Sequence, residues 1–298
     1  MGKFKEFTTS HPVITSVTLW TLAVLVTGAC LMWQDKTGPT YPLHGTVQTA
    51  KGPVEFEFLR SENLGTDLKV LLINPVPEGV TATVKFRRFT SGDAWKTIPL
   101  SAGAFEFTRR GSVTKIEGLG AELPALQERA GKYEYFVSID DGSGEPFSIT
   151  GEQAILARYK GEVPLAVLAI HILAIFLAML LAVRTTLEAI VDGNFKWMLW
   201  ATIVAFILGA FVLGPIVQWY AFRVWWSGFP LGGDWTDNKV VFELAAWLVA
   251  LALNWGKRRN RWIVVGAGLV TLAVYFIPHS IFGSEFNYGR GPSRGTGG

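Results

Sequence analysis

The sequence predicts an α plus β membrane protein, with five transmembrane helices and an immunoglobulin- or fibronectin-like β-sandwich inserted between helices 1 and 2. Half of the 298 residues are hydrophobic, only 17% are charged and twelve are tryptophan, which is unusual for a soluble protein. Apolar runs fill residues 12–33 and 163–278. Residues 40–160 are instead polar and rich in glycine and proline, with short alternating segments. These observations separate a membrane part from a β part.

The apolar runs have the length of membrane spans. An α-helix rises about 1.5 Å per residue, so roughly 20 apolar residues cross a hydrocarbon core of about 30 Å. After a short cytoplasmic N-terminus (1–11), the predicted spans are 12–33, 163–183, 197–219, 240–255 and 262–277. The last two are short, and Trp255 and Trp262 are expected to anchor their ends. Small residues at 209–214 and 266–270 predict close approach of neighbouring helices.

The first span needs comparison with a cleaved signal. VTGAC, which ends at Cys30, is similar to a lipoprotein processing site, but Thr27 stands where leucine is usual. We therefore expect an uncleaved anchor, with a lipidated Cys30 as the alternative. Because Cys30 is the single cysteine, an intramolecular disulfide is excluded.

Lysine and arginine in short loops predict the orientation in the membrane. The segment GKRRNR, residues 256–261, is expected to be cytoplasmic because of four cations: Lys257, Arg258, Arg259 and Arg261. The N-terminus MGKFKEF is basic as well. Alternation then places 184–196 inside, and places 34–162, 220–239 and a flexible tail, 279–298, outside. The expected location is the bacterial inner membrane, with the β-domain and the C-terminus periplasmic.

The polar domain, residues 34–162, has the pattern of antiparallel strands. Strand-like segments lie at 53–59, 67–75, 81–89, 103–110, 131–140 and 146–158, and turn-forming stretches such as NPVPEG and TSGDAW separate them. Many short strands in about 120 residues favour an immunoglobulin- or fibronectin-like sandwich, here without the cysteine pair of antibody domains.

A resemblance accompanies this pattern. The stretches VKFRRFTSGDAWKTIPL and LPALQERAGKYEYFVSIDDG, and also GPIVQWYAFRVWWSGFPLGGDWTDNKVVFELAAWLVAL, resemble uncharacterised bacterial multi-spanning inner-membrane proteins with an outward-facing Ig-like domain. The similarity covers over half of the chain. That family has no assigned activity, so the resemblance implies architecture alone.

His171 and His279 are the candidate cofactor ligands. Both are predicted on the outer side, and an ionisable residue inside a bilayer is a functional candidate. Two helices that each offer an imidazole can hold a b-type haem. His171, however, lies some 10 Å deeper than His279 by helix rise, and a hydrogen bond from His171 to a neighbouring helix or a partner subunit is the alternative. The sequence requires no cofactor and predicts no metal site. His171 and His279 would allow a contact with haem or a pigment.

The loop WWSGFPLGGDWTDNK, residues 225–239, is the candidate interaction site. Its tryptophans suit the headgroup layer, and Thr236 or Asp237 is expected to cap the following helix. We predict a docking surface for the β-domain or a neighbouring subunit, in preference to a catalytic role of the aspartates. The expected interfacial residues are Trp225, Trp226, Asp234, Trp235, Asp237 and Asn238.

Lys239 and Glu243 follow directly. Their spacing of four residues predicts an ion pair on one helix face near the membrane surface.

Catalytic motifs are absent from the sequence: there is no G-x-S-x-G, H-E-x-x-H, Walker A or G-x-G-x-x-G pattern in a suitable context. A net charge of +3 does not favour a nucleic-acid partner. We therefore expect a non-catalytic accessory or scaffolding subunit of a multi-subunit, energy-transducing inner-membrane complex, either photosynthetic or a respiratory, electron-transport one. Its expected partners are the lipid bilayer and other integral membrane subunits. The alternatives are a haem-binding redox subunit that uses His171 and His279, and a periplasmic ligand sensor or transporter accessory protein.

Overall fold

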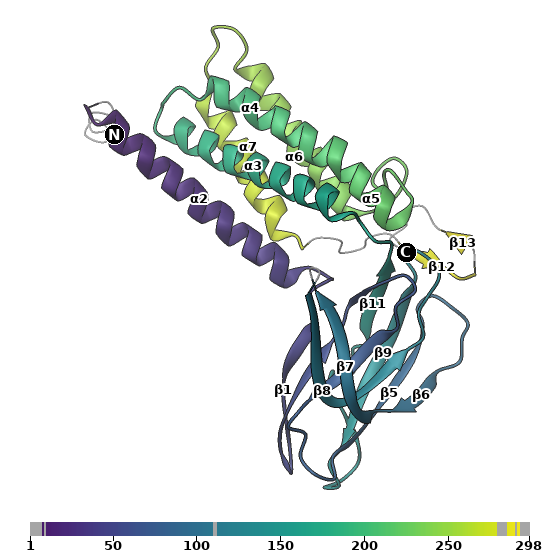
Figure 1. Ribbon diagram of the computed structural model, residues 1–298. Helices are drawn as coiled ribbons and strands as arrows, with labels where there is room; N and C mark the ends of the chain where they lie inside the picture. Colours follow the sequence, from purple (N-terminus) through teal and green to yellow (C-terminus); the bar gives the residue numbers. More distant parts are fainter. Residues whose placement is uncertain (1–7, 9, 110–111, 279–284, 290, 293–298) are drawn as a thin grey trace. The chain divides into compact units, whose positions relative to one another are not determined.

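The structure is a computed structural model that describes residues 8, 10–109, 112–278, 285–289 and 291–292 (Figure 1). The chain forms two compact units. The helical unit contains the described residues up to Gly38 and those from Val163 to Pro278. The strand unit contains Pro39–Glu162 and the described residues after 284. The protein is therefore α plus β, with helices in one unit and strands in the other.

The helical unit consists of long apolar helices (Figure 1). In chain order these are α2 (Pro12–Thr37), α3 (Leu165–Ile190), α4 (Lys196–Phe206), the π-helix η1 (Ile207–Leu213), α5 (Gly214–Phe222), α6 (Trp235–Leu253) and α7 (Arg261–Phe276). Within the described ranges, three helical segments are long and apolar enough to cross a membrane: α2, α3 and the continuous segment Lys196–Phe222. By the same measure, α7 is apolar but short, with 16 residues. The first nine residues of α6 include Asp237, Lys239 and Glu243, which reduces its apolar character.

Helix α3 is longer than its predicted span. It continues past Val183 to Ile190, so most of the predicted cytoplasmic loop 184–196 is helical. The extension is stabilised by Arg184, whose Nη1 donates to Glu188 Oε2 at 2.6 Å, one turn further along the helix. The loop between α3 and α4 therefore spans only residues 191–195.

Small residues permit close helix packing, as the sequence predicts. A Cβ atom on Gly209 would lie 2.9 Å from Ile175 Cδ1 and 3.2 Å from the backbone nitrogen of Ile175. A Cβ atom on Gly268 would lie 1.9 Å from Thr186 Oγ1. Helix α3 thus approaches both η1 and α7 closely because glycine stands at each contact.

The interior of the helical unit is shared by α3, α4, α6 and α7 (Figure 1). It contains the fully buried Ala182, Leu199, Phe206, Trp247 and Val264, among others. Helix α2 lies along α3, and its Ala23 packs with Met179 and Val183 of that helix.

The strand unit has two sheets that face a common core (Figure 1). One sheet has the order β1-β2-β4-β8-β7, and the other has the order β3-β11-β9-β5-β6 with β10 paired to β9. Neighbouring strands are antiparallel except for β3 and β11. The bounds are β1 (Leu43–Thr49), β2 (Gly52–Phe58), β3 (Ser61–Asn63), β4 (Leu68–Ile73), β5 (Thr81–Arg88), β6 (Lys96–Pro99), β7 (Ser101–Arg109), β8 (Ser112–Leu123), β9 (Lys132–Asp140), β10 (Phe147–Ser148) and β11 (Ile155–Lys160).

Alternating side chains build the core between these sheets. In β5, Ala82, Val84 and Phe86 are buried while the residues between them point outward, which confirms the alternation predicted for 81–89. Phe58 of the first sheet lies edge-on to Tyr135 of the second, at 6.4 Å between ring centroids. The two-sheet part of the sequence prediction is thus confirmed, and the narrower immunoglobulin- or fibronectin-like class stays a prediction.

Strand β8 lacks a regular alternation of apolar and polar residues because it contains glycine. A Cβ atom on Gly118 would lie 1.9 Å from the carbonyl oxygen of Leu72 in the neighbouring strand. A Cβ atom on Gly120 would meet the ring of Phe105 at 2.5 Å. These glycines are required where strands and rings approach closely, although glycine is typical of loops in sequence patterns.

Part of the predicted flexible tail, 279–298, is ordered. Strands β12 (Phe286–Asn287) and β13 (Gly291–Pro292) form a hairpin within the strand unit. The backbone nitrogen of Phe286 donates to Ala130 O at 3.0 Å, and Lys132 Nζ lies 2.9 Å from Glu285 Oε2. A composition typical of linkers does not reveal such contacts, because their partners lie far away in the sequence. The rest of the tail, His279 included, lies outside the described residues.

Candidate functional site

The loop between α5 and α6 is organised around the carboxylate of Asp237. Its Oδ2 accepts hydrogen bonds from the backbone nitrogens of Ser227 at 2.7 Å and Gly228 at 3.0 Å. It also accepts from Ser227 Oγ at 2.9 Å and from Gln218 Nε2 at 3.1 Å. A carboxylate that receives several donors binds them strongly. Asp237 therefore holds the loop to the end of α5 and the start of α6.

Asp234 provides the cap of α6. Its Oδ1 accepts from the backbone nitrogen of Thr236 at 2.8 Å, and its Oδ2 lies 3.2 Å from Ser227 Oγ, whose single proton is shared with Asp237. The sequence-based choice of Thr236 or Asp237 as the cap is wrong, because the helix begins at Trp235 and the cap position is the residue before it. Asn238 also holds the loop, since its Oδ1 accepts from Phe229 N at 2.6 Å.

Aromatic stacking orients the tryptophans of this loop. Trp225 is stacked on Trp219 at a centroid distance of 4.8 Å and an interplanar angle of 11°. Trp226 is stacked on Phe211 at 5.8 Å, and its Nε1 donates to Phe229 O at 3.1 Å. Trp226 is only partly exposed, so it supports the loop more than it contributes to its surface.

Four large apolar side chains nevertheless point outward from this loop. Trp225 is 54% exposed, Phe229 77%, Leu231 56% and Trp235 44%. We call these four residues the aromatic rim. The sequence identifies its two tryptophans but not Phe229 or Leu231, and the available signal is a pair of apolar residues between glycines in SGFPLGG.

The buried face of α6 carries polar groups. Lys239, Glu243 and Trp247 stand one turn apart, and each is less than 8% exposed. Trp247 Nε1 donates to Thr271 Oγ1 of α7 at 2.9 Å. Among the described residues no ion pair joins Lys239 to Glu243, although their spacing predicts one. Lys239 Nζ donates to Ile277 O at 3.0 Å. Glu243 Oε1 is buried with no hydrogen-bond partner in the described part of the molecule.

His171 makes the predicted contact with a neighbouring helix. Its Nδ1 lies 3.1 Å from the carbonyl oxygen of Gly209 in η1. Because a carbonyl only accepts, Nδ1 carries the proton and Nε2 keeps its lone pair. π-Helices occur often at functional sites. Across the described ranges, no three histidine, cysteine, aspartate or glutamate residues gather as a metal site. The predicted partner His279 lies outside those ranges.

The four predicted orientation cations lie at one end of the helical unit. Arg259 Nη2 donates to Asp192 O at 2.6 Å, to Asp192 Oδ1 at 2.9 Å and to Gly193 O at 2.9 Å. Arg261 lies 3.8 Å from the same carboxylate. Lys257 and Arg258 are exposed. Contacts from Arg259 and Arg261 to Asp192 therefore join the loop after α6 to the loop after α3. The exposed Lys257 and Arg258 make residues 256–261 a basic surface.

Arg184 is a buried cation that sequence reasoning missed. It is 3% exposed, and its guanidinium carbon lies 5.3 Å from the centroid of the Trp20 ring on α2. Its spacing of four residues from Glu188 is the signal that could have identified it.

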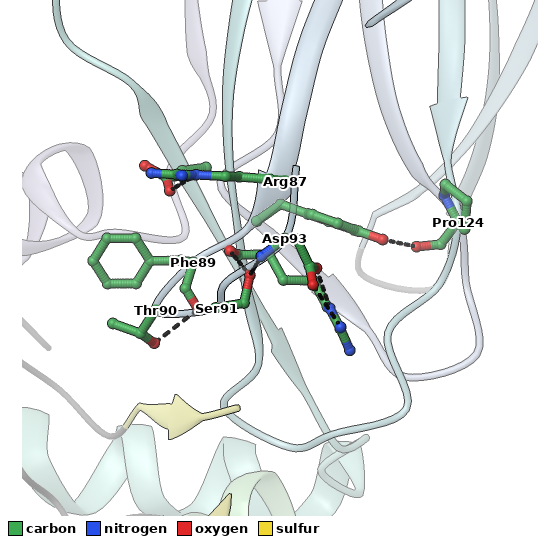
Figure 2. Close-up of polar contacts among 9 residues, drawn as sticks. Arg87, Phe89, Thr90, Ser91, Asp93 and Pro124 are labelled. Carbon is green, nitrogen blue, oxygen red and sulfur yellow. Dashed lines mark hydrogen bonds and ion pairs between the residues drawn. The ribbon is translucent and has the colours of Figure 1, made fainter. Parts of the chain in front are cut away.

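In the strand unit, polar contacts concentrate in the turn after β5 (Figure 2). Arg88 binds Asp93 through two bonds, from Nε at 2.5 Å and from Nη2 at 2.9 Å, and these bonds lower the pKa of Asp93. Arg87 Nε donates to Glu134 Oε1 at 2.6 Å. The Arg88 guanidinium also lies 4.4 Å from the Tyr288 ring. The turn therefore holds the C-terminal hairpin in place, which is a structural role.

The strand unit also has a shallow depression of about 580 Å³ beside β7 and β8. Glu78 and Glu117 lie on it, and glycine, alanine and proline make up much of the remaining lining. The ligand-sensor alternative requires a pocket in the β-domain, and this depression is the candidate for it. Its walls offer two carboxylates and few other side-chain polar groups.

No protein-family model, no curated protein and no solved structure matches this chain.

Proposed function

We propose that the chain is a non-catalytic accessory subunit of a larger membrane complex, whose helical unit spans the bilayer and whose aromatic rim binds a neighbouring integral membrane protein. The distribution of polar groups on α6 is the observation that supports a bilayer-spanning helical unit. Lys239 and Glu243 face inward, whereas Phe242 is 62% exposed, Leu248 46% and Val249 53%. Such an arrangement is costly in water and favourable in lipid.

Five spans are part of this proposal. At about 1.5 Å per residue, α6 reaches about 28 Å and α7 about 24 Å. Both lengths are close to the hydrocarbon thickness of about 30 Å, and Trp255 and Trp262 lie at the ends of these helices, where interfacial residues compensate for short spans. The basic surface at 256–261 then favours an inner-membrane protein with that end in the cytoplasm and the strand unit in the periplasm.

The docking role rests on the rigidity of the aromatic rim. Asp237 and Asn238 hold the loop backbone at Ser227 and Phe229, and Asp234 contacts the Ser227 hydroxyl. A loop that is already ordered loses little conformational entropy when it binds. Exposed tryptophan on a rigid support is typical of interface hot spots. The position of the rim next to the start of a proposed span favours a partner that is itself in the membrane. We also propose that the complex to which the chain belongs is energy-transducing.

Purification of the tagged full chain from its native membranes in a mild detergent tests the proposal. We expect co-purifying integral membrane subunits, and we expect the double variant Phe229→Ser/Trp235→Ser to lose them. The matched control is Ile190→Ser/Trp197→Ser, two exposed apolar residues at the other end of the helical unit, which should keep them. A monomer without partners from wild-type membranes would contradict the proposal.

A second candidate, a haem-binding redox subunit, is favoured by the proton position on His171. Ligating histidines usually donate their other ring N–H to a carbonyl or carboxylate, and His171 does so to Gly209 O. In this candidate, Nε2 of His171 would bind the haem iron. An absorption spectrum tests it: a Soret band that is lost in His171→Ala would support it, and a wild-type complex without such a band would end it.

A further inference from the structure

A groove opens between the start of α4 and the end of α6, at the basic end of the helical unit. It has a volume of about 200 Å³ and is lined by Lys196, Leu199, Trp200, Leu251 and residues 254–256. Leu199 and Leu251 provide an apolar floor. Trp200 is 46% exposed and Trp255 is 62% exposed, and their rings meet edge-on at 5.6 Å.

The wall of this groove is held in place by Asn254, which is 3% exposed. Its Nδ2 donates to Ala250 O at 2.8 Å and to Asn260 O at 3.1 Å, and its Oδ1 accepts from Asn260 N at 2.6 Å. Lys196 Nζ reaches across the groove and donates to Gly256 O at 2.5 Å. The site is therefore formed before any ligand enters.

Positive charge beside the groove is not neutralised. Arg259 and Arg261 are compensated by Asp192. Lys257 and Arg258, which directly follow the groove residue Gly256, are exposed and make no side-chain hydrogen bond or ion pair within the described ranges. Lys196 uses one of its three N–H donors on Gly256, so two remain.

We propose that this groove binds one anionic phospholipid of the bilayer, with its phosphate at Lys196, Lys257 and Arg258 and one acyl chain along Trp200 and Leu251. The charge of the site selects the headgroup, since basic pockets between transmembrane helices recognise anionic lipids. The two tryptophans suit the boundary between headgroup and chain, because their rings are apolar with one polar N–H. This inference rests on the proposed membrane-spanning role of the helical unit and names the lipid class that it binds.

Native mass spectrometry of the purified full chain, with added phosphatidylglycerol or phosphatidylcholine, tests the inference. We expect wild type to retain one phosphatidylglycerol in preference to phosphatidylcholine. Lys257→Gln/Arg258→Gln should weaken this retention by about five-fold for each cation removed. Both side chains are exposed and make no hydrogen bond or ion pair within the described ranges, so the variant tests lipid binding with little effect on the fold. Lys196→Gln should weaken retention as well.

The control is Arg223→Gln, an exposed cation at the other end of the helical unit, which should retain the lipid as wild type does. Equal retention of the two lipids by wild type would overturn the inference, and so would undiminished retention by Lys257→Gln/Arg258→Gln. Lipid retention is measured on the isolated chain. Its failure is therefore distinct from a failure to find partner subunits, and a chain that fractionates away from membranes would count against the proposed function itself.

Discussion

The carboxylate of Asp237 lies 2.7 Å from the backbone nitrogen of Ser227, ten residues earlier in the chain, and this bond joins the first turn of α6 to the loop before it. The same carboxylate oxygen receives Gly228 N at 3.0 Å. These two backbone groups have a charged acceptor where solvent is largely excluded, since Ser227 and Gly228 are buried. The aromatic rim depends on this bond for its shape.

Asp237→Asn should loosen the loop, because an amide carries no charge and presents an N–H₂ group to existing donors. We expect a loss of about 1–3 kcal/mol in the free energy of unfolding, and faster proteolysis within residues 228–233. Thermal unfolding in detergent and limited proteolysis measure the two effects. Asp35→Asn, a change of the same kind at an exposed position of α2, is the control. Equal stability of the two variants would mean that Asp237 does not hold the loop.

Thr271→Val should destabilise the contact between α6 and α7. The substitution leaves Trp247 Nε1–H, which now donates to Thr271 Oγ1 at 2.9 Å, buried without a partner. The expected loss is about 1–3 kcal/mol, and Thr271→Ser should recover most of it. In a double-mutant cycle, Trp247→Phe should cost less in the Thr271→Val background than in wild type. Strict additivity would show that the hydrogen bond contributes nothing.

Glu243→Gln should be tolerated. Glu243 is 1% exposed, its Oε1 has no partner in the described chain, and Lys239 Nζ donates to Ile277 O. An uncompensated buried charge is costly, so replacing the carboxyl group by an amide of the same shape should leave the free energy of unfolding unchanged or raise it. A loss of about 3–5 kcal/mol, the usual cost of breaking a buried ion pair, would mean that Lys239 and Glu243 are paired in the membrane. Thermal unfolding of the purified variant distinguishes the two results.

Acid should loosen the turn after β9 through Asp141. Hydrogen bonds from Ser143 Oγ, Ala50 N and Ser143 N lower the pKa of Asp141 to about 2. Because this pKa lies below the unfolded value of about 3.9, the stabilisation is complete above pH ~4 and is lost as the pH falls through about 2. Hydrogen exchange at Ala50 and Ser143 should accelerate in that window. Asp141→Asn should abolish the pH dependence, and an unchanged profile in this variant would assign it to another group.

Local patterns in the sequence predict the elements better than their ends and contacts. Strand β5 and the apolar spans follow from periodicity, because burial alternates every second residue or continues for about 20. The cap at Asp234 and the extension of α3 through Arg184 depend on where a helix starts or stops, which a few side-chain contacts decide. The sequence pattern does not predict strand β8. Its glycines are required by close contacts with Leu72 and Phe105 in neighbouring strands, which a local pattern does not reveal.

The candidate sites depend even more on contacts between distant residues. The tryptophans of the rim are visible in the sequence, but its most exposed member, Phe229, owes its position to a bond from its backbone nitrogen to Asn238. The spacing of Lys239 and Glu243 predicts an ion pair, whereas the Lys239 ammonium donates to the carbonyl oxygen of Ile277, 38 residues away. The lipid groove combines Trp200 and Trp255, which only the packing of α4 on α6 brings together.

Site-specific photo-crosslinking from position 229 in intact membranes tests whether the aromatic rim binds an integral membrane subunit. Phe229 is the most exposed member of the aromatic rim, and Phe242, an exposed residue two turns into α6, provides the control position. We expect a discrete protein adduct at position 229, identified by mass spectrometry as an integral membrane subunit, and no such adduct at position 242. Lipid adducts alone at both positions would show that the rim only anchors the chain in the bilayer, and would contradict its role as an accessory subunit.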